Sequence, residues 1–205
     1  MRRLGLLIFL FLFTLGCCSE PPVHGGENLV VYSDPPSTVE YMGGGTSQIT
    51  VGSKIWGVKG LLYATSFGDD SVTRYAYHNI GTGKLVQGQP YVITAYVKMT
   101  DLSAPVVGAS QNDVTKDFVF MLGDTEATNV LANVNMGNNI YRVGAYTSSL
   151  LYSGVQRCGI MKHGHSSKSF EVSGWQVEDG ITPTEYNFSP KTAKGTSISG
   201  GVTIR

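Results

Sequence analysis

Charged residues are scarce in this chain of 205 residues. Asp, Glu, Lys and Arg together make up 15% of the sequence, against roughly 25% in ordinary soluble domains. The 15 basic residues balance the 15 acidic ones, so no net positive charge attracts a DNA or RNA backbone. The composition therefore excludes nucleic acid as an expected partner. At roughly 100–200 residues per domain, the length allows one ordinary domain with appendages, or two very small domains.

Cysteine is also rare: the chain has three, of which two are adjacent near the N-terminus. Only Cys158 lies in the body of the chain, which leaves no partner there for an internal disulfide. We expect Cys158 to be a small, buried, apolar residue. His163 and His165 lie close to it in the sequence, but a structural zinc site uses four ligands. A solvated loop is therefore the preferred interpretation of the two histidines.

Long amphipathic helices are missing outside the N-terminal segment, because no stretch of about eleven residues repeats apolar positions at helical spacing. Short runs rich in Val, Thr, Tyr and Ile instead alternate with turns rich in Gly, Asp and Asn. This alternation predicts an all-β protein, either a β-sandwich or a barrel. The expected strands are residues 28–33, 63–67, 72–80, 91–99, 118–122, 140–147, 154–162 and 169–177.

The first 18 residues have the pattern of a secretory signal peptide. Arg2 and Arg3 precede about a dozen apolar residues, a run shorter than the roughly 20 residues of a transmembrane helix. The following Gly16-Cys17 resembles a bacterial lipoprotein signal, in which the cysteine is lipidated. We predict lipidation at Cys17, with Cys18 as the alternative acceptor. Ordinary cleavage, or retention as an uncleaved anchor, stays open, and each alternative predicts an exported protein.

The remaining chain divides into three parts by composition. Residues 19–27 form a Pro/Gly-rich linker, residues 28–190 contain the expected strands, and residues 191–205 form a Ser/Thr/Gly-rich tail. The body is therefore predicted to be one β domain between two flexible segments.

Three segments of this body carry a resemblance to a known family. They are Glu27-Asn28-Leu29-Val30 at its start, Gly88–Lys98 in its middle, and Val172–Tyr186 at its end. This layout resembles the carbohydrate-binding-module-like jelly rolls of bacteriophage tail-fibre and other virion proteins, over about residues 27–190. The resemblance implies a two-sheet antiparallel β-sandwich of jelly-roll type, without catalysis, that binds glycans or assembles with virion subunits.

Carbohydrate binding requires flat aromatic rings beside polar groups. Tyr75 and Tyr77 share one strand face with polar neighbours, and Tyr96 shares a face of the central strand with Thr94. Ordinary packing within the sandwich is the alternative role for these rings, and Trp175 is expected in the core together with Trp56. We predict carbohydrate contacts from five tyrosines: Tyr75, Tyr77, Tyr96, Tyr146 and Tyr152.

Catalytic motifs are absent from the sequence. It contains no Gly-x-Ser-x-Gly, His-Glu-x-x-His or phosphate-binding Gly-x-x-x-x-Gly-Lys motif, and nothing pairs two carboxylates as a glycosidase requires. The prediction is a non-catalytic module displayed on a cell surface or virion, whose partner is a glycan or cell-surface polysaccharide. The alternative is a structural protein that associates with itself or with virion subunits. The N-terminus would supply contact with a membrane.

No cofactor is predicted. A structural calcium ion is conceivable at Asp69-Asp70 or between Asp113 and Asp117, because carboxylates are calcium ligands. The twelve-residue calcium loop pattern is missing, so aspartates that form turns are the preferred interpretation.

Overall fold

The computed structural model describes residues 27–30, 41–43, 49–51, 64–69 and 71–185. The predicted signal peptide with Cys17 and Cys18, the tail, Trp56 and Asp70 lie outside the described residues. Within the described ranges, no helix is long and apolar enough to cross a membrane.

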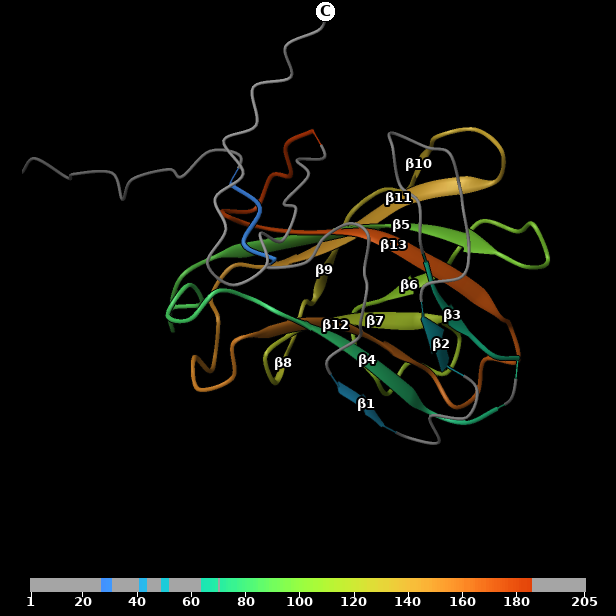
Figure 1. Cartoon of the computed structure of the whole chain (residues 1–205), viewed down its shortest axis with the longest axis horizontal. Coiled ribbons are helices and arrows are strands. Elements are labelled where there is room, and N and C mark those ends of the chain that lie inside the picture. Colours follow the sequence, from blue (N-terminus) through green and yellow to red (C-terminus); the bar gives the residue numbers. More distant parts are fainter. Residues whose placement is uncertain (1–26, 31–40, 44–48, 52–63, 70, 186–205) are drawn as a thin grey trace, which may run out of the picture.

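The described strands form two sheets that pack face to face (Figure 1). In the first, which we call the β4–β12 sheet, the order is β1 (Tyr41–Gly43), β4 (Arg74–Asn79), β12 (Arg157–Lys162), β7 (Phe118–Leu122) and β6 (Val107–Gly108), and β8 (Thr125–Glu126) also pairs with β7. In the second, the β5–β13 sheet, the order is β10 (Val134–Asn135), β11 (Ile140–Thr147), β5 (Tyr91–Met99), β13 (Phe170–Asp179), β3 (Thr65–Phe67) and β2 (Ile49–Val51), and β9 (Asn129–Val130) also pairs with β11. The described pairs are antiparallel except for β6 and β7. The predicted all-β, two-sheet antiparallel β-sandwich of jelly-roll type is confirmed.

The longer strands lie where the alternation predicts them. β5, β7 and β11 span the predicted residues, whereas β3, β4 and β12 begin two or three residues later than predicted. The two-residue strands β6 and β8 were not predicted, because such short runs contain no readable period. In the first predicted strand only residues 28–30 are described, and Val30 forms a single bridge to Ile80.

The core lies between the sheets and follows the two-residue period of the strands. In β5, Ile93, Ala95 and Val97 face the core and are fully buried. Trp175 and Cys158 are also fully buried there, which confirms the core positions predicted for both.

The opening and closing sequence segments meet in space, although 147 residues separate them. The Asn28 side chain donates to the Trp175 carbonyl at 2.9 Å and accepts from the Val177 amide at 3.2 Å. The β13 ladder is shifted between Ser173 and Gln176, and Gly174 there has φ +60°, a conformation that glycine adopts without strain. Asn28 therefore binds a bulge that places Trp175 in the core.

Candidate functional site

The outer face of the β4–β12 sheet is apolar where a solvated sheet face would be polar. A buried cluster of Tyr77, Val119, Met121 and Met161 lies there, and the partly exposed Tyr75 packs against it. We call these five residues the tyrosine–methionine face.

Gly159 permits the close packing of this face. It pairs with Tyr77 across β12 and β4, and a Cβ on Gly159 would lie 2.5 Å from Cδ1 of Tyr77. The Tyr77 ring therefore lies against the backbone of β12. Its centroid is 6.5 Å from that of Tyr75, with 25° between the ring planes, and the Arg157 guanidinium carbon is 5.1 Å from the Tyr77 centroid. Two rings of similar orientation thus stand beside a cation.

Exposure within this face is uneven. Tyr77 is 9% exposed, Met121 8% and Met161 4%, whereas Tyr75 is partly exposed. A ligand at this face would therefore meet Tyr75 first, while Tyr77 and the methionines support it from the side.

The outer face of the β5–β13 sheet is polar, and the chain uses it for its own packing. Glu178 accepts hydrogen bonds from both the amide and the hydroxyl of Thr184. Gln176 donates to the Thr184 hydroxyl at 3.3 Å, and Arg142 donates to the Thr184 carbonyl and to the Thr94 hydroxyl. Gln176 and Glu178 are buried, at 0% and 2% exposure. The segment after β13 therefore folds back over this polar face.

The structure separates the five predicted tyrosines. Tyr75 and Tyr77 lie together on the tyrosine–methionine face. Tyr96 faces outward on the β5–β13 sheet but has no exposed surface, so it is not the open platform that the sequence predicted, because other parts of the chain cover it. Tyr146 is half-buried on the neighbouring strand, and Tyr152 is 67% exposed in the loop before β12.

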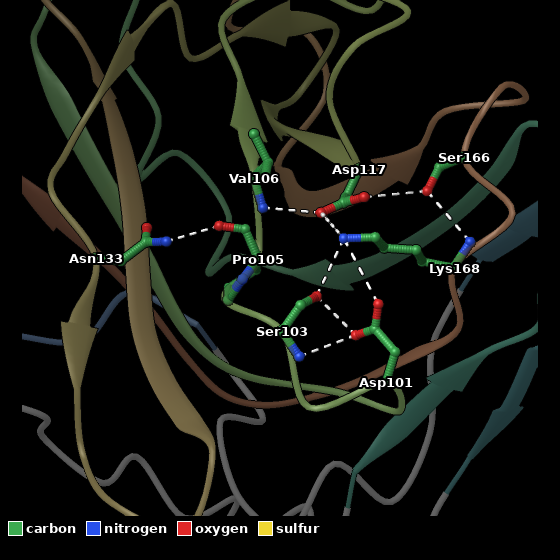
Figure 2. Close-up of polar contacts among 8 residues, drawn as sticks. All are labelled: Asp101, Ser103, Pro105, Val106, Asp117, Asn133, Ser166 and Lys168. Carbon is green, nitrogen blue, oxygen red and sulfur yellow. Dashed lines mark hydrogen bonds and ion pairs between the residues drawn. The ribbon is translucent and has the colours of Figure 1, made fainter.

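A polar network closes one end of the sandwich, between the loops that follow β5 and β12 (Figure 2). Lys168 Nζ donates to the Ser103 hydroxyl at 3.0 Å and lies 3.7 Å from Asp101 and 4.0 Å from Asp117. The bonds from Ser103, followed by the charge of Lys168, hold the pKa of Asp101 below its usual value. A lysine ammonium thus provides the positive charge between these carboxylates.

The aspartates considered for calcium are engaged in bonds within the chain. Asp117 accepts from the Val106 amide at 2.8 Å and from the Ser166 hydroxyl at 3.2 Å. Asp113 accepts from the amide and the hydroxyl of Thr115. Among the residues that the structure describes, no three His, Cys, Asp or Glu side chains gather as metal ligands. The turn-forming role preferred for these aspartates agrees with the bonds of Asp113.

The core contains a buried histidine, His78, at 0% exposure. The His78 ring is 4.9 Å from the Trp175 ring, and neither of its nitrogens has a hydrogen-bond partner among the described residues. Burial lowers the pKa of His78 to about 4. The imidazole is therefore neutral in the folded protein near neutral pH.

Comparisons with known proteins find only distant structural similarity. No family model matches the chain, and no curated protein matches it. Similar solved structures include the CBM22-1 xylan-binding domain from Paenibacillus barcinonensis Xyn10C, with 10% identity, a TM-score of 0.45, and coverage of 76% of this chain and 97% of that domain. The enzymatically active domain of bacteriophage CBA120 tailspike protein 4 has 11% identity and a TM-score of 0.43, over 74% of this chain and 21% of that one. With TM-scores below 0.5, these likenesses assign neither a family nor a ligand.

Sequence reasoning missed the residues that support the tyrosine pair. Met121 and Met161 lie at outward positions of predicted strands, and Gly159 lies between Tyr77 and Met121 in the sheet. Apolar residues at positions that alternation assigns to solvent were the available signal. That signal needed the pairing of β12 with β4 and β7, which the sequence does not supply.

Proposed function

We propose that this protein is a non-catalytic module that binds carbohydrate through the tyrosine–methionine face. The proposal rests on one observation: Tyr75 and Tyr77 present two similarly oriented rings on an outer sheet face, beside Arg157. A pyranose places its C–H groups on an aromatic ring, while polar side chains fix its hydroxyls. Tyr75 would provide the ring that contacts the sugar, and Arg157 would donate hydrogen bonds from the rim.

A non-catalytic role agrees with the hydrogen bonds that Glu178 and Glu126 make within the chain. Glu178 is committed to Thr184, and Glu126 accepts a hydrogen bond from the Gln111 amide at 3.0 Å. A glycosidase needs two carboxylates free to act on one bond. Carboxylates that hold the chain's own loops instead favour recognition without hydrolysis.

The alternative function is assembly with other subunits, and the composition of the same face favours it. Tyrosine, methionine and arginine are enriched at protein–protein interfaces. A virion or surface subunit could pack where the glycan would otherwise bind. The two functions differ in what contacts Tyr75: a sugar ring in carbohydrate binding, or another subunit in assembly.

We also propose that the N-terminus attaches the module to a membrane after export. The apolar run of residues 4–15 followed by Gly16-Cys17 supports lipidation at Cys17. Binding of one sugar by a single shallow site is weak, and several modules held on one surface would multiply the apparent affinity.

A glycan array with residues 19–205 tests the carbohydrate proposal. The parent chain should retain one sugar class, and Tyr75→Ala should weaken its binding roughly tenfold, because an aromatic contact contributes about 0.5–1.5 kcal/mol beyond its buried area. Tyr152→Ala is the matched control, since Tyr152 is exposed but lies in the loop before β12 and not in the cluster that forms this face.

Two other results would decide against the proposal. Binding that survives Tyr75→Ala but is lost in Tyr152→Ala would move the site to the loop. An array without retained sugar, combined with sedimentation of the parent as an oligomer that Tyr75→Ala dissociates, would establish the assembly function.

A further inference from the structure

One end of the sandwich carries exposed apolar side chains on loops that are hydrogen-bonded to one another. Val86 is 49% exposed, Leu151 65%, Tyr152 67% and Ile181 48%. They lie on the loops before β5, before β12 and after β13. We call these four residues the apolar tip.

The loops of the apolar tip are bonded to one another. Gly88 donates to the Leu150 carbonyl and Leu150 to the Gln89 carbonyl, both at 2.8 Å. The Gln156 side chain accepts from the Leu85 amide at 2.8 Å and donates to the Leu85 carbonyl at 3.0 Å. Leu85 and Leu150 are each 1% exposed. Each loop therefore buries one leucine, while the residue that follows it in the chain, Val86 or Leu151, points to solvent.

The third loop joins the same end. The Gly180 amide donates to the Pro90 carbonyl at 2.9 Å, which places Ile181 beside the loop before β5. In Figure 1 the loops before β5 and before β12 lie at the left of the sandwich. The four exposed side chains thus share one end of the fold.

The described start of the domain also lies at this end. Glu27 pairs with Lys84 at 3.1 Å, and the Gly81 amide donates to the Leu29 carbonyl at 3.3 Å. Nine residues, 18–26, separate Cys17 from Glu27, and the ten Cα–Cα steps between these two residues span at most about 36 Å. The nine residues of β5 extend about 30 Å between the two ends. A chain attached through Cys17 therefore has a reach comparable to the length of the sandwich, and it joins the module at the end that carries the apolar tip.

We infer that the apolar tip is a membrane-contacting surface. It binds the same lipid bilayer to which the N-terminus is attached. The inference rests on the membrane attachment proposed above, not on carbohydrate binding. Tyrosine is enriched at the membrane interface, and aliphatic side chains enter the boundary of the acyl chains. A single acyl chain holds a protein only marginally, so a second apolar contact strengthens attachment.

This contact also orients the candidate carbohydrate site. β4, which carries Tyr75 and Tyr77, runs between the two ends of the sandwich (Figure 1). With the apolar tip on the bilayer, the tyrosine–methionine face lies roughly perpendicular to the membrane plane, and a glycan would approach its partly exposed residue, Tyr75, from the side. The polar network around Lys168 then points away from the membrane.

Fluorescence quenching in the full chain tests the inference. An environment-sensitive dye is attached at Leu151→Cys, and in a separate protein at Leu102→Cys, which is the matched control because Leu102 is 57% exposed at the opposite end. Both carry Cys18→Ser, and both are placed in phosphatidylethanolamine–phosphatidylglycerol vesicles that contain spin-labelled lipid. We expect several-fold stronger quenching and a blue-shifted emission at position 151 relative to position 102.

Equal quenching at the two positions overturns the inference. A second pair of proteins controls for membrane insertion that the dye itself causes. Both carry the dye at Val86→Cys, and one also carries Leu151→Ser and Tyr152→Ser, which should reduce the quenching severalfold. Unchanged quenching would also overturn the inference. A full chain that does not sediment with vesicles refutes both the attachment and the membrane contact. The glycan array is independent of each of these outcomes.

Discussion

The two outer faces of this sandwich differ in what covers them. On the β5–β13 sheet, buried Gln176 and Glu178 hold Thr184, so the chain itself satisfies the polar groups of that face. On the β4–β12 sheet, the tyrosine–methionine face is apolar and leaves Tyr75 partly exposed.

This difference separates structural from binding roles. A buried carboxylate or amide without partners is unfavourable by about 1–3 kcal/mol, so the polar face requires the segment after β13 for stability. An aromatic ring has no such requirement, and it can stay partly exposed until a ligand covers it. Four changes test this contrast, from the largest expected effect to the smallest.

The largest effect is expected from Gly159→Ala. A Cβ there would lie 2.4 Å from the Ala76 carbonyl oxygen and 2.5 Å from the Tyr77 ring, so the strand or the ring must shift. We expect a loss of about 3 kcal/mol in the free energy of unfolding, measured by urea denaturation.

The matched change on the opposite sheet is Gly144→Ala. Its Cβ would lie 2.7 Å from the Ile93 carbonyl oxygen and 2.8 Å from the Thr94 Cγ2. A methyl group on Thr94 moves more easily than an aromatic ring packed on a strand, so the loss should be smaller. An equal or larger loss for Gly144→Ala would contradict the special packing of the tyrosine–methionine face.

The second effect concerns His78, in the core beneath both faces. Its pKa is about 4 in the folded protein and about 6.5 when unfolded, so the unfolded chain binds the proton more tightly. Stability is complete above about pH 6.5 and falls as the pH decreases toward 4, by about 3 kcal/mol from this group. Urea denaturation at pH 7 and pH 4 measures the loss.

His78→Leu should reduce that pH-dependent loss, whereas His165→Gln, at an exposed position, should leave it unchanged. A pH profile that is the same in all three proteins would place the acid sensitivity elsewhere.

A smaller effect is expected from Thr184→Val on the polar face. The change removes the hydroxyl that donates to Glu178 and accepts from Gln176, while Thr184 itself is exposed and water can partly replace it. We expect a loss of about 1–2 kcal/mol in the free energy of unfolding. The control is Thr182→Val, at an exposed position two residues away, and a similar loss in the control would show that the network contributes little.

The smallest effect on stability is expected from Tyr75→Ala. Because Tyr75 lies at the edge of its cluster and is partly exposed, its removal should cost under about 1 kcal/mol by thermal denaturation. Its carbohydrate binding should nevertheless fall roughly tenfold. A large loss of stability would show that Tyr75 is a packing residue. Both outer faces would then serve stability, and the contrast between them would not hold.

The closing sequence segment illustrates how much of the fold could be predicted. The alternation of Trp175 and Val177 with Gln176 and Glu178 assigned each residue to its observed face. Gly180 has φ +96°, a conformation that glycine adopts without strain and that lets the chain turn sharply after β13. The partners of these residues, Asn28 among them, could not be predicted, because no local rule pairs residues so far apart.

The candidate site was predicted only in part for the same reason. Tyr75 and Tyr77 share a face because they are two residues apart on one strand. Tyr96 satisfied the same rule on its own strand, yet it is fully buried. Alternation assigns a side chain to one face of a sheet, but it does not reveal which other segment covers that face.

The sequence by itself therefore determined the fold class, the positions of the long strands and the inward or outward direction of their side chains, since these follow from local periodicity. Only the tertiary structure decided which outer face carries an apolar cluster, which tyrosines meet, and which loops gather beside Glu27. The physical reason is that strand pairing and burial depend on contacts between residues distant in the chain. These contacts form only when the two sheets pack together, so local sequence patterns do not reveal them.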